Sequence, residues 1–366
     1  MKRILAILLV LCMLLCGCGS DEEEVTEATQ SEATEESSKV EVKEEKKEES
    51  KVEESSIVEE KEVFRHPLTG EVLEEPWKGV AAASTINNAP DALPQYGISQ
   101  ADVFYEIEVE GGITRMLAIF TDLEDVGSIG PVRSARTIFN NIATSYGAPL
   151  FHCGGSSYAD NRQYDDSGAQ IENFKHVNEM DNGQYFFRDL DRYNYQGYAW
   201  EHTLFTTGED MAAALQDKGF DNGEELNFGL NFAEKPDFAG DEANEVIVTF
   251  RGGKTYTLTY NADTGLYEGA EYGSEHIDAA TGEVMQYRNV FVIYATQRVN
   301  YHSFYDLMGS GSGHFACDGK IIPIKWSRET VYDHFVYTME DGTPLTLGVG
   351  NSYIGIVSDT RTVEYN

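Results

Sequence analysis

The sequence has few cysteines and none of the common metal motifs. Only five of its 366 residues are cysteine, and no two have the C-x-x-C spacing of zinc sites and thioredoxin-like centres. The H-E-x-x-H motif and the EF-hand loop are also absent. Gly309-Ser310-Gly311-Ser312-Gly313 has glycine where a hydrolase carries its serine, and it lacks the lysine of a P-loop. We therefore expect a flexible loop there, no metal and no resident cofactor.

Basic residues are scarce as well. The chain has 27 Lys and Arg against 63 Asp and Glu, a formal charge of −36. After residue 62, 45 acidic residues face 19 basic ones. This balance excludes nucleic-acid binding through a broad basic face, and it argues against membrane attachment by charge alone. The same excess of acids makes no single pair of carboxylates informative as a catalytic pair.

The N-terminus has the pattern of a bacterial lipoprotein signal. Lys2 and Arg3 precede a twelve-residue apolar run, 4–15, which is shorter than the roughly 20 residues of a spanning helix. Leu15-Cys16-Gly17-Cys18 places glycine just before Cys18, whereas Cys16 would follow the larger Leu15. The pattern predicts a signal peptide over 1–17, a lipid on Cys18 and an extracytoplasmic, membrane-anchored protein. An ordinary secretory peptide is the alternative.

Residues 18–62 are expected to be a disordered tether. Between residues 20 and 62 there are 18 acidic and 6 basic residues and no aromatic residue, so little surface can be buried. An exposed helix held by Glu–Lys pairs is the alternative, and either would act as a spacer.

Residues 63–220 alternate between strand and helix patterns. Strands are expected at 80–86, 103–109, 113–120 and 149–153. One helix should begin near Arg133 or Ser134 and stop at Gly147, and another should span 209–218 behind an N-cap at Thr206 or Thr207. We predict an α/β or α+β domain with a mixed sheet and flanking helices.

Residues 221–366 read as a mostly antiparallel β domain. Short β-rich runs at 246–250, 256–260, 289–294 and 355–357 are separated by turn signals, and no long helical pattern is visible. Cys153 and Cys317 either form one disulfide or remain two separate thiols.

The best candidate for chemistry is the string from Gly130 to Arg136. If a helix began near Arg133, its free N–H groups and the two guanidinium groups of Arg133 and Arg136 would suit a phosphate, pyrophosphate or carboxylate. The alternative is that both arginines pair with carboxylates in this acidic chain.

Further polar residues raise the interest of this region. Arg115 follows a Gly-Gly turn, Arg188 precedes Asp189, and Gly154-Gly155 follows a strand. His152 and His202 lie beside strand ends, although structural roles are the alternative for each. His152 and Cys153 should not form a catalytic dyad, because neighbours on a strand point to opposite faces.

These motifs resemble the YerB-like lipoproteins, a family defined by a domain of unknown function and a separate C-terminal domain. The resemblance is carried by the strings 66–70, 100–102 with 105–106, 110–115, 129–136, 154–155, 188–189, 202–206, 288–292, 318–326 and 341–350. It departs at Glu201-His202-Thr203, where the family usually has Pro-His-Asn. The resemblance implies an envelope location and a two-part architecture, but no established reaction.

Two functions follow as hypotheses. The first is a non-enzymatic envelope protein that binds an anionic group of a wall polymer, a lipid-linked precursor or a partner protein, through Arg115, Arg133, Arg136 and Arg188. The second is an enzyme of phosphoryl-transfer type acting on envelope glycopolymers, since the motif order is similar to that of the LytR-CpsA-Psr phosphotransferases. The enzyme would need an acid such as Asp102 or Glu106 beside the arginines, together with Mg²⁺.

Overall fold

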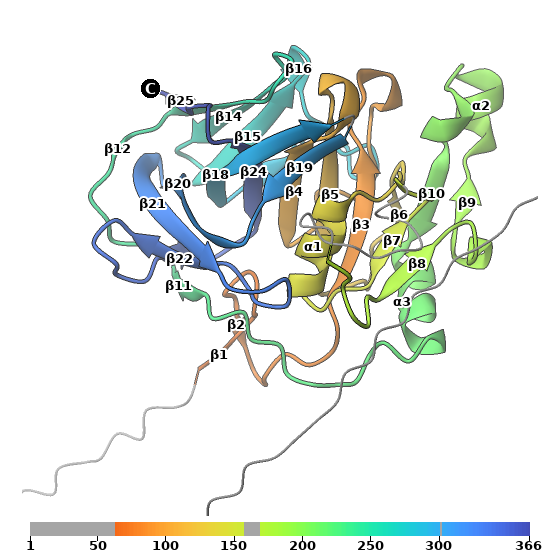
Figure 1. The fold of residues 1–366 in the computed structure, drawn as a ribbon, viewed down its shortest axis with the longest axis horizontal. Helices are drawn as coiled ribbons and strands as arrows, with labels where there is room; N and C mark the ends of the chain where they lie inside the picture. The colour runs from red at the N-terminus through yellow and green to blue at the C-terminus, as the bar shows by residue number, and fades with distance from the viewer. Residues whose placement is uncertain (1–62, 157–168, 301) are drawn as a thin grey trace, which may run out of the picture. The chain divides into compact units, whose positions relative to one another are not determined.

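A mixed sheet of twelve strands forms the body of the fold in this computed structural model, which describes residues 63–156, 169–300 and 302–366 (Figure 1). Its strand order is β12 (Asp241–Glu242), β21 (Lys320–Arg328), β20 (Gly309–Cys317), β18 (Asn289–Asn300), β24 (Ser352–Ser358), β4 (Val103–Glu108), β5 (Thr114–Phe120), β3 (Ala82–Asn87), β7 (Leu150–His152) and β8 (His176–Asn178). Strand β19 (His302–Asp306) pairs with β18, and β22 (Val336–Met339) pairs with β21.

A second, antiparallel sheet lies against one face of this main sheet. It comprises β16 (Ser274–Glu275), β15 (Leu266–Glu271), β14 (Thr255–Asn261), β13 (Glu245–Thr249) and β25 (Glu364–Tyr365), with β17 (Gln286–Tyr287) on β15. Smaller sheets are formed by β6 (Ser128–Ile129), β10 (Leu204–Thr207) and β9 (Phe187–Arg188), by β1 (Phe64–Arg65) and β2 (Val72–Leu73), and by β11 (Asn231–Ala233) and β23 (Thr346–Gly348).

The helices of the described residues are short. The α-helices are α1 (Thr137–Ser145), α2 (Leu190–Tyr195) and α3 (Gly208–Asp217), and the 3₁₀ turns are η1 (Pro90–Ala92), η2 (Glu110–Gly112), η3 (Gly183–Tyr185) and η4 (Trp200–His202). The chain is therefore mostly β, with mixed and antiparallel sheets. None of these helices is long and apolar enough to cross a membrane.

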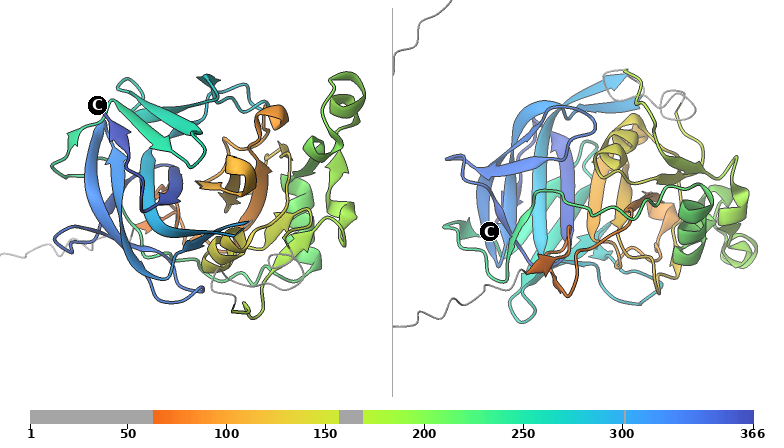
Figure 2. Two further views of the ribbon diagram at one scale, coloured as in Figure 1. Left: turned by 45° about the horizontal axis from the view of Figure 1, so that its top comes forward. Right: turned by 90° about the horizontal axis from the view of Figure 1, so that it is seen from below.

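The main sheet crosses the boundary that the sequence predicted at residue 220. β24 pairs in parallel with β4 on one side and with β18 on the other, so strands from both segments share one hydrogen-bonded sheet. Figure 2 shows the blue C-terminal strands lying beside the orange N-terminal ones. The domain boundary itself stays a prediction.

Alternating side chains give the main sheet two cores. Tyr105 and Ile107 of β4 pack in one core with Ile138 of α1, whereas Phe104 packs with Val248 of the second sheet. Glu106 therefore faces the second sheet, while Arg115 of β5, which pairs with Asn87, faces the α1 side.

Helix α1 begins later than the sequence predicted. We expected a start near Arg133 or Ser134, but the first helical residue is Thr137. The preceding residues are held as extended chain by distant strands; for example, the N–H of Val132 donates to the carbonyl of Leu204 at 2.7 Å. The shared helical face expected for the arginines does not form. Helix α3 does match its prediction, because the Thr207 hydroxyl caps it by accepting from the N–H of Asp210 at 3.0 Å.

The glycine-rich stretch 309–313 was wrongly predicted to be a loop. It forms the start of β20 and pairs with β21, and Gly313 also pairs with β18. Its glycines serve close packing, because a Cβ on Gly311 would lie 2.5 Å from the indole of Trp326, and one on Gly313 would lie 2.6 Å from the carbonyl of Val292. The absence of side chains at these glycines allows residues from other strands to approach closely. The local sequence gives no sign of these contacts.

We expect Gly311→Ala to lower the free energy of unfolding by about 1–3 kcal/mol, because the added methyl overpacks against a buried indole. The indole cannot shift freely, since its Nε1 donates to the carbonyl of Tyr294 at 3.1 Å. Urea unfolding measures the difference. The control Ser312→Ala, at an exposed position of the same strand, should change stability by less than about 0.5 kcal/mol. Equal losses in the two variants would contradict the packing role.

Candidate functional site

The segment that carries Arg133 and Arg136 is fixed by its backbone. The N–H of Arg133 donates to the carbonyl of Thr85 at 3.0 Å, and the carbonyl of Arg133 accepts from the N–H of Cys153 at 3.1 Å. The N–H of Ala135 donates to the carbonyl of Gly154 at 3.0 Å. Backbone hydrogen bonds to β3 and to the turn after β7 therefore fix the positions of Arg133 and Arg136.

Arg115 is the most buried of the predicted arginines. Only 4% of its surface is exposed, and its Nη1 donates to the carbonyl of Ser134 at 2.6 Å. Among the described residues no carboxylate lies within ion-pair distance of its guanidinium. Burial lowers the pKa of Arg115 well below its usual value, and the positive charges of Arg136 and Arg133 lower it further. The negative charges of Glu110 and Glu201, the partners of Arg136 and Arg133, act on this pKa in the opposite direction.

The other three predicted arginines have acidic partners. Arg133 pairs with Glu201 at 3.0 Å, and Arg188 pairs with Glu179 at 3.8 Å. Arg136 binds both carboxylate oxygens of Glu110, at 2.5 and 2.8 Å. We call Arg115, Arg133, Arg136 and Arg188 the arginine group. With three carboxylates against four guanidinium groups, it keeps one formal positive charge.

The predicted residues around Gly154 serve the backbone of this region. Nδ1 of His152 contacts the carbonyl of Gly154 at 2.7 Å, and Nε2 contacts Nδ1 of His176 at 3.0 Å. The N–H of Gly154 donates to Oδ1 of Asn178 at 2.8 Å, while Gly155 bridges to the segment before α1. Burial lowers the pKa of His152 to about 4, so its ring is neutral at neutral pH. His152 therefore adds no charge to the arginine group.

His202 lies on the same side, at the end of η4. Its Nδ1 contacts Nδ2 of Asn87 at 2.8 Å, and its Nε2 lies 3.8 Å from Glu201. Burial lowers the pKa of His202, and Arg133 adds to this while Glu201 opposes it. The sequence pattern thus found residues that the fold gathers near Arg133, from segments far apart in the chain.

The two downstream cysteines are separate thiols. Sγ of Cys153 donates to a carboxylate oxygen of Glu179 at 3.3 Å, and neither Cys153 nor Cys317 is in a disulfide. Burial raises the pKa of Cys153 to about 11 and that of Cys317 to about 12. Neither thiol is activated for nucleophilic attack. His152 and Cys153 have different partners, which agrees with the prediction that they form no dyad.

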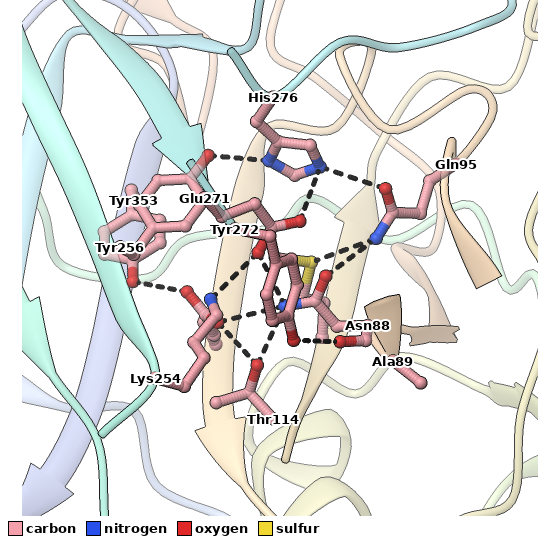
Figure 3. A network of polar contacts seen from close by, with 12 residues as sticks. Asn88, Ala89, Gln95, Thr114, Lys254, Tyr256, Glu271, Tyr272, His276 and Tyr353 are labelled. Atoms are coloured by element: carbon pink, nitrogen blue, oxygen red, sulfur yellow. Dashed lines mark hydrogen bonds and ion pairs between the residues drawn. The ribbon is translucent and has the colours of Figure 1, made fainter. Parts of the chain in front are cut away.

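A second polar centre lies on the opposite face of the sheet, and the sequence did not reveal it. Lys254 is ion-paired with both Glu106 and Glu271, the latter at 2.9 Å, and all three side chains are buried. Nδ2 of Asn88 donates to Glu106 at 3.0 Å and to Glu271 at 2.9 Å, and the Thr114 hydroxyl donates to Glu106 at 2.6 Å. Figure 3 shows Lys254, Glu271, Asn88 and Thr114 converging on this centre. We call it the lysine centre.

Tyrosine and histidine side chains surround the lysine centre. The hydroxyl of Tyr353 donates to Glu106 at 2.8 Å. Nδ1 of His276 contacts the Tyr256 hydroxyl at 2.8 Å, and Nε2 contacts Oε1 of Gln95 at 3.1 Å (Figure 3). The network therefore links β4 and β24 of the main sheet to β14 and β15 of the second sheet.

The two carboxyl groups of the lysine centre respond differently to burial. Burial raises the pKa of Glu106, and Lys254 only partly opposes this. Burial also acts on Glu271, but the charges of His276 and Lys254 outweigh it, so the pKa of Glu271 is lowered. The ammonium group of Lys254 is thus shared by two buried carboxylates. Its removal leaves both carboxylates without this counter-charge.

The two acids named above for an enzyme, Asp102 and Glu106, do not join the arginine group, whose carboxylates come instead from other residues. Asp102 accepts hydrogen bonds from the N–H and the hydroxyl of Thr121, both at 2.7 Å. Glu106 belongs to the lysine centre. The only sequence signal for that centre was a glutamate between Tyr105 and Ile107 in an apolar strand. Lys254 gave no signal, because its partners come from strands distant in the chain.

No group of three His, Cys, Asp or Glu side chains suited to hold a metal ion occurs within the described ranges.

We expect Lys254→Met to lower the free energy of unfolding by about 3–5 kcal/mol at neutral pH, because two buried carboxylates lose their counter-charge. The loss should shrink as the pH falls, since protonation of Glu106, whose pKa is already raised, removes part of the repulsion. Chemical unfolding at about pH 7 and again at about pH 5 measures the loss of stability and its dependence on pH. The exposed Lys218→Met is the control for loss of a charge. A deficit that does not change with pH would argue against the electrostatic cause.

Comparisons with known proteins agree with this architecture. Residues 68–221 match the family model "Protein of unknown function (DUF3048) N-terminal domain", and residues 246–354 match the corresponding C-terminal domain. The chain is 28% identical over 302 residues to the "Putative lipoprotein YerB" of Bacillus subtilis (strain 168), covering 80% of this chain and 86% of the relative. A crystal structure of the YerB protein from Bacillus subtilis matches with a TM-score of 0.69 at 27% identity, covering 82% of this chain and 99% of that one.

Proposed function

Because the chain belongs to the YerB-like family of DUF3048 proteins, we propose that it is an extracytoplasmic lipoprotein whose arginine group binds an anionic ligand. The lipid would be carried by Cys18, which lies outside the described residues. The name of the relative from Bacillus subtilis and the Leu15–Cys18 pattern support this location. The ligand would be an anionic group on a wall polymer, a lipid-linked precursor or a partner protein.

The observation that carries the proposal is the unpaired charge of Arg115. A buried guanidinium without a carboxylate partner costs several kcal/mol, on the order of the penalty for any uncompensated buried ion. Here Arg136 and Arg133 increase that cost through repulsion, and Glu110 and Glu201 offset part of it without pairing directly with Arg115. A bound anion would remove this free-energy cost. A residue whose only role was to stabilise the fold would not be expected to carry such a cost.

Arg133 offers a second open position. Its Nε is buried and has no hydrogen-bond partner among the described residues. Its ion pair with Glu201 is weakly held, because the Glu201 side chain is 54% exposed and exposed pairs contribute little. An incoming anion could therefore take the place of Glu201 and accept from the guanidinium. Phosphate, pyrophosphate and carboxylate all suit this fork geometry.

We expect Arg115→Met to abolish binding of pyrophosphate while leaving the stability of the ligand-free protein unchanged or higher, because it removes an uncompensated buried charge. Isothermal titration calorimetry measures the affinity and thermal unfolding measures the stability. In the wild-type protein, pyrophosphate at 100 times its Kd should add about 2.7 kcal/mol of stability. Arg115→Met should lose this increment.

The control is Lys320→Met, which removes one positive charge at an exposed position of β21, toward the opposite edge of the main sheet from β5. It should bind pyrophosphate as the wild type does. If Arg115→Met were strongly destabilised and pyrophosphate binding persisted, Arg115 would be a structural residue and the anion site would be refuted.

The anchor is tested separately by metabolic labelling with a radioactive fatty acid. We expect Cys18→Ser to abolish labelling and to release the protein from the membrane fraction, because the thiol is the attachment point. Cys16→Ser is the matched control and should label normally. Labelling that survives in Cys18→Ser would contradict the assignment of the lipid to this residue.

A further inference from the structure

Trp200 is an exposed aromatic ring held in a fixed position beside the arginine group. Half of its surface, 50%, is exposed. The guanidinium of Arg188 lies 4.8 Å from the ring centre, and the ring of Tyr193 meets it edge-on at 5.4 Å. Nη1 of Arg188 also donates to the carbonyl of Trp200 at 2.9 Å. The ring is thus preorganised on the surface instead of buried in the core.

The turn η4 connects this ring directly to the anion site. Trp200 is followed by Glu201, the partner of Arg133, and then by His202. The indole therefore projects from the residue next to the carboxylate that pairs with Arg133 at 3.0 Å. A ligand whose charged group replaced Glu201 would place its next chemical group over or beside the indole.

The surroundings of Trp200 favour a ring-bearing, polar ligand. Tyr193, 47% exposed, presents a second aromatic ring on α2. Exposed Trp and Tyr rings suit ligands, such as sugars, that have an apolar ring face and polar hydroxyl groups around the edge of the ring. The strongly negative body disfavours a polyanionic nucleic acid, whereas a single phosphate on a sugar is matched by the one net positive charge of the arginine group.

We infer that the site binds a hexose phosphate, with the phosphate at Arg115 and Arg133 and the sugar ring stacked on Trp200. This inference rests on the proposed function and specifies its ligand class. It assigns Trp200 as the residue that distinguishes a sugar phosphate from a bare phosphate. The same hexose phosphate can be free, part of a polymer or the headgroup of a lipid.

The test compares glucose 1-phosphate, inorganic phosphate, glucose and adenosine monophosphate as soluble probes in calorimetric titrations of the full-length protein. We expect glucose 1-phosphate to bind at least about tenfold more tightly than inorganic phosphate, because one apolar face of the sugar would be buried against the indole. Glucose alone should not bind measurably. Adenosine monophosphate binding as tightly as glucose 1-phosphate would overturn the assignment to sugars.

Trp200→Ala should reduce the affinity for glucose 1-phosphate to that for inorganic phosphate, whereas the affinity for inorganic phosphate should not change. Trp200→Phe, which keeps a ring, should retain most of the difference and guards against a folding defect. Tyr332→Ala removes an aromatic ring of similar exposure, 49%, and should have no effect. If Trp200→Ala left the preference for glucose 1-phosphate intact, the inference would be refuted.

The anion site and the assignment of its ligand to a sugar phosphate are refuted by different results. If no phosphate compound binds the wild-type protein, the anion site itself is wrong. If inorganic phosphate and glucose 1-phosphate bind equally and both depend on Arg115, the anion site stands and the sugar assignment is wrong. Phosphatidylcholine vesicles containing phosphatidylglucose, compared with soluble glucose 1-phosphate, tell a lipid headgroup from a soluble source. Arg115-dependent binding to the vesicles assigns the lipid, and its absence assigns a soluble or polymeric sugar phosphate.

Discussion

The parallel pairing of β24 with β4 is the constraint on which the rest of this structure depends. It places one of the last strands of the chain beside one of the first, so that the main sheet is continuous across both family domains. It also brings the Tyr353 hydroxyl to Glu106, at the heart of the lysine centre. Because strand side chains alternate, the same pair of strands directs one set of polar groups toward the second sheet and leaves the other face for α1 and the arginine group.

The two faces treat buried cations in opposite ways. Lys254 lies between Glu106 of the main sheet and Glu271 of the second sheet, so the charge ties the sheets together. Arg115 is equally buried, but its guanidinium donates to a backbone carbonyl, and Glu110 and Glu201 act on it without pairing directly with it. A compensated charge contributes specificity to a fold, whereas an uncompensated one costs stability. This contrast within one molecule is the reason why we propose the arginine group, and not the lysine centre, as a binding site.

Much of the local structure could be predicted because it depends on neighbours in the chain. Strands near 103–109 and 113–120 follow from alternating side chains, and the Thr207 cap of α3 follows from the four residues around it. The start of α1 and the glycine stretch at 309–313 could not be predicted. In both cases hydrogen bonds or close packing from distant strands override the local preference.

The sequence by itself determined the family, the presence of mixed and antiparallel sheets and the choice of candidate arginines, because composition, alternation and short motifs are properties of the chain alone. It did not determine that the whole fold is mostly β, since an α/β or α+β first domain was expected. The tertiary structure alone decided which of these charges are neutralised. Arg133, Arg136 and Arg188 find Glu201, Glu110 and Glu179, while Arg115 finds no carboxylate among the described residues. The physical reason is that ion pairing acts over a few ångströms of space, and residues far apart in sequence are brought within that distance only by the fold.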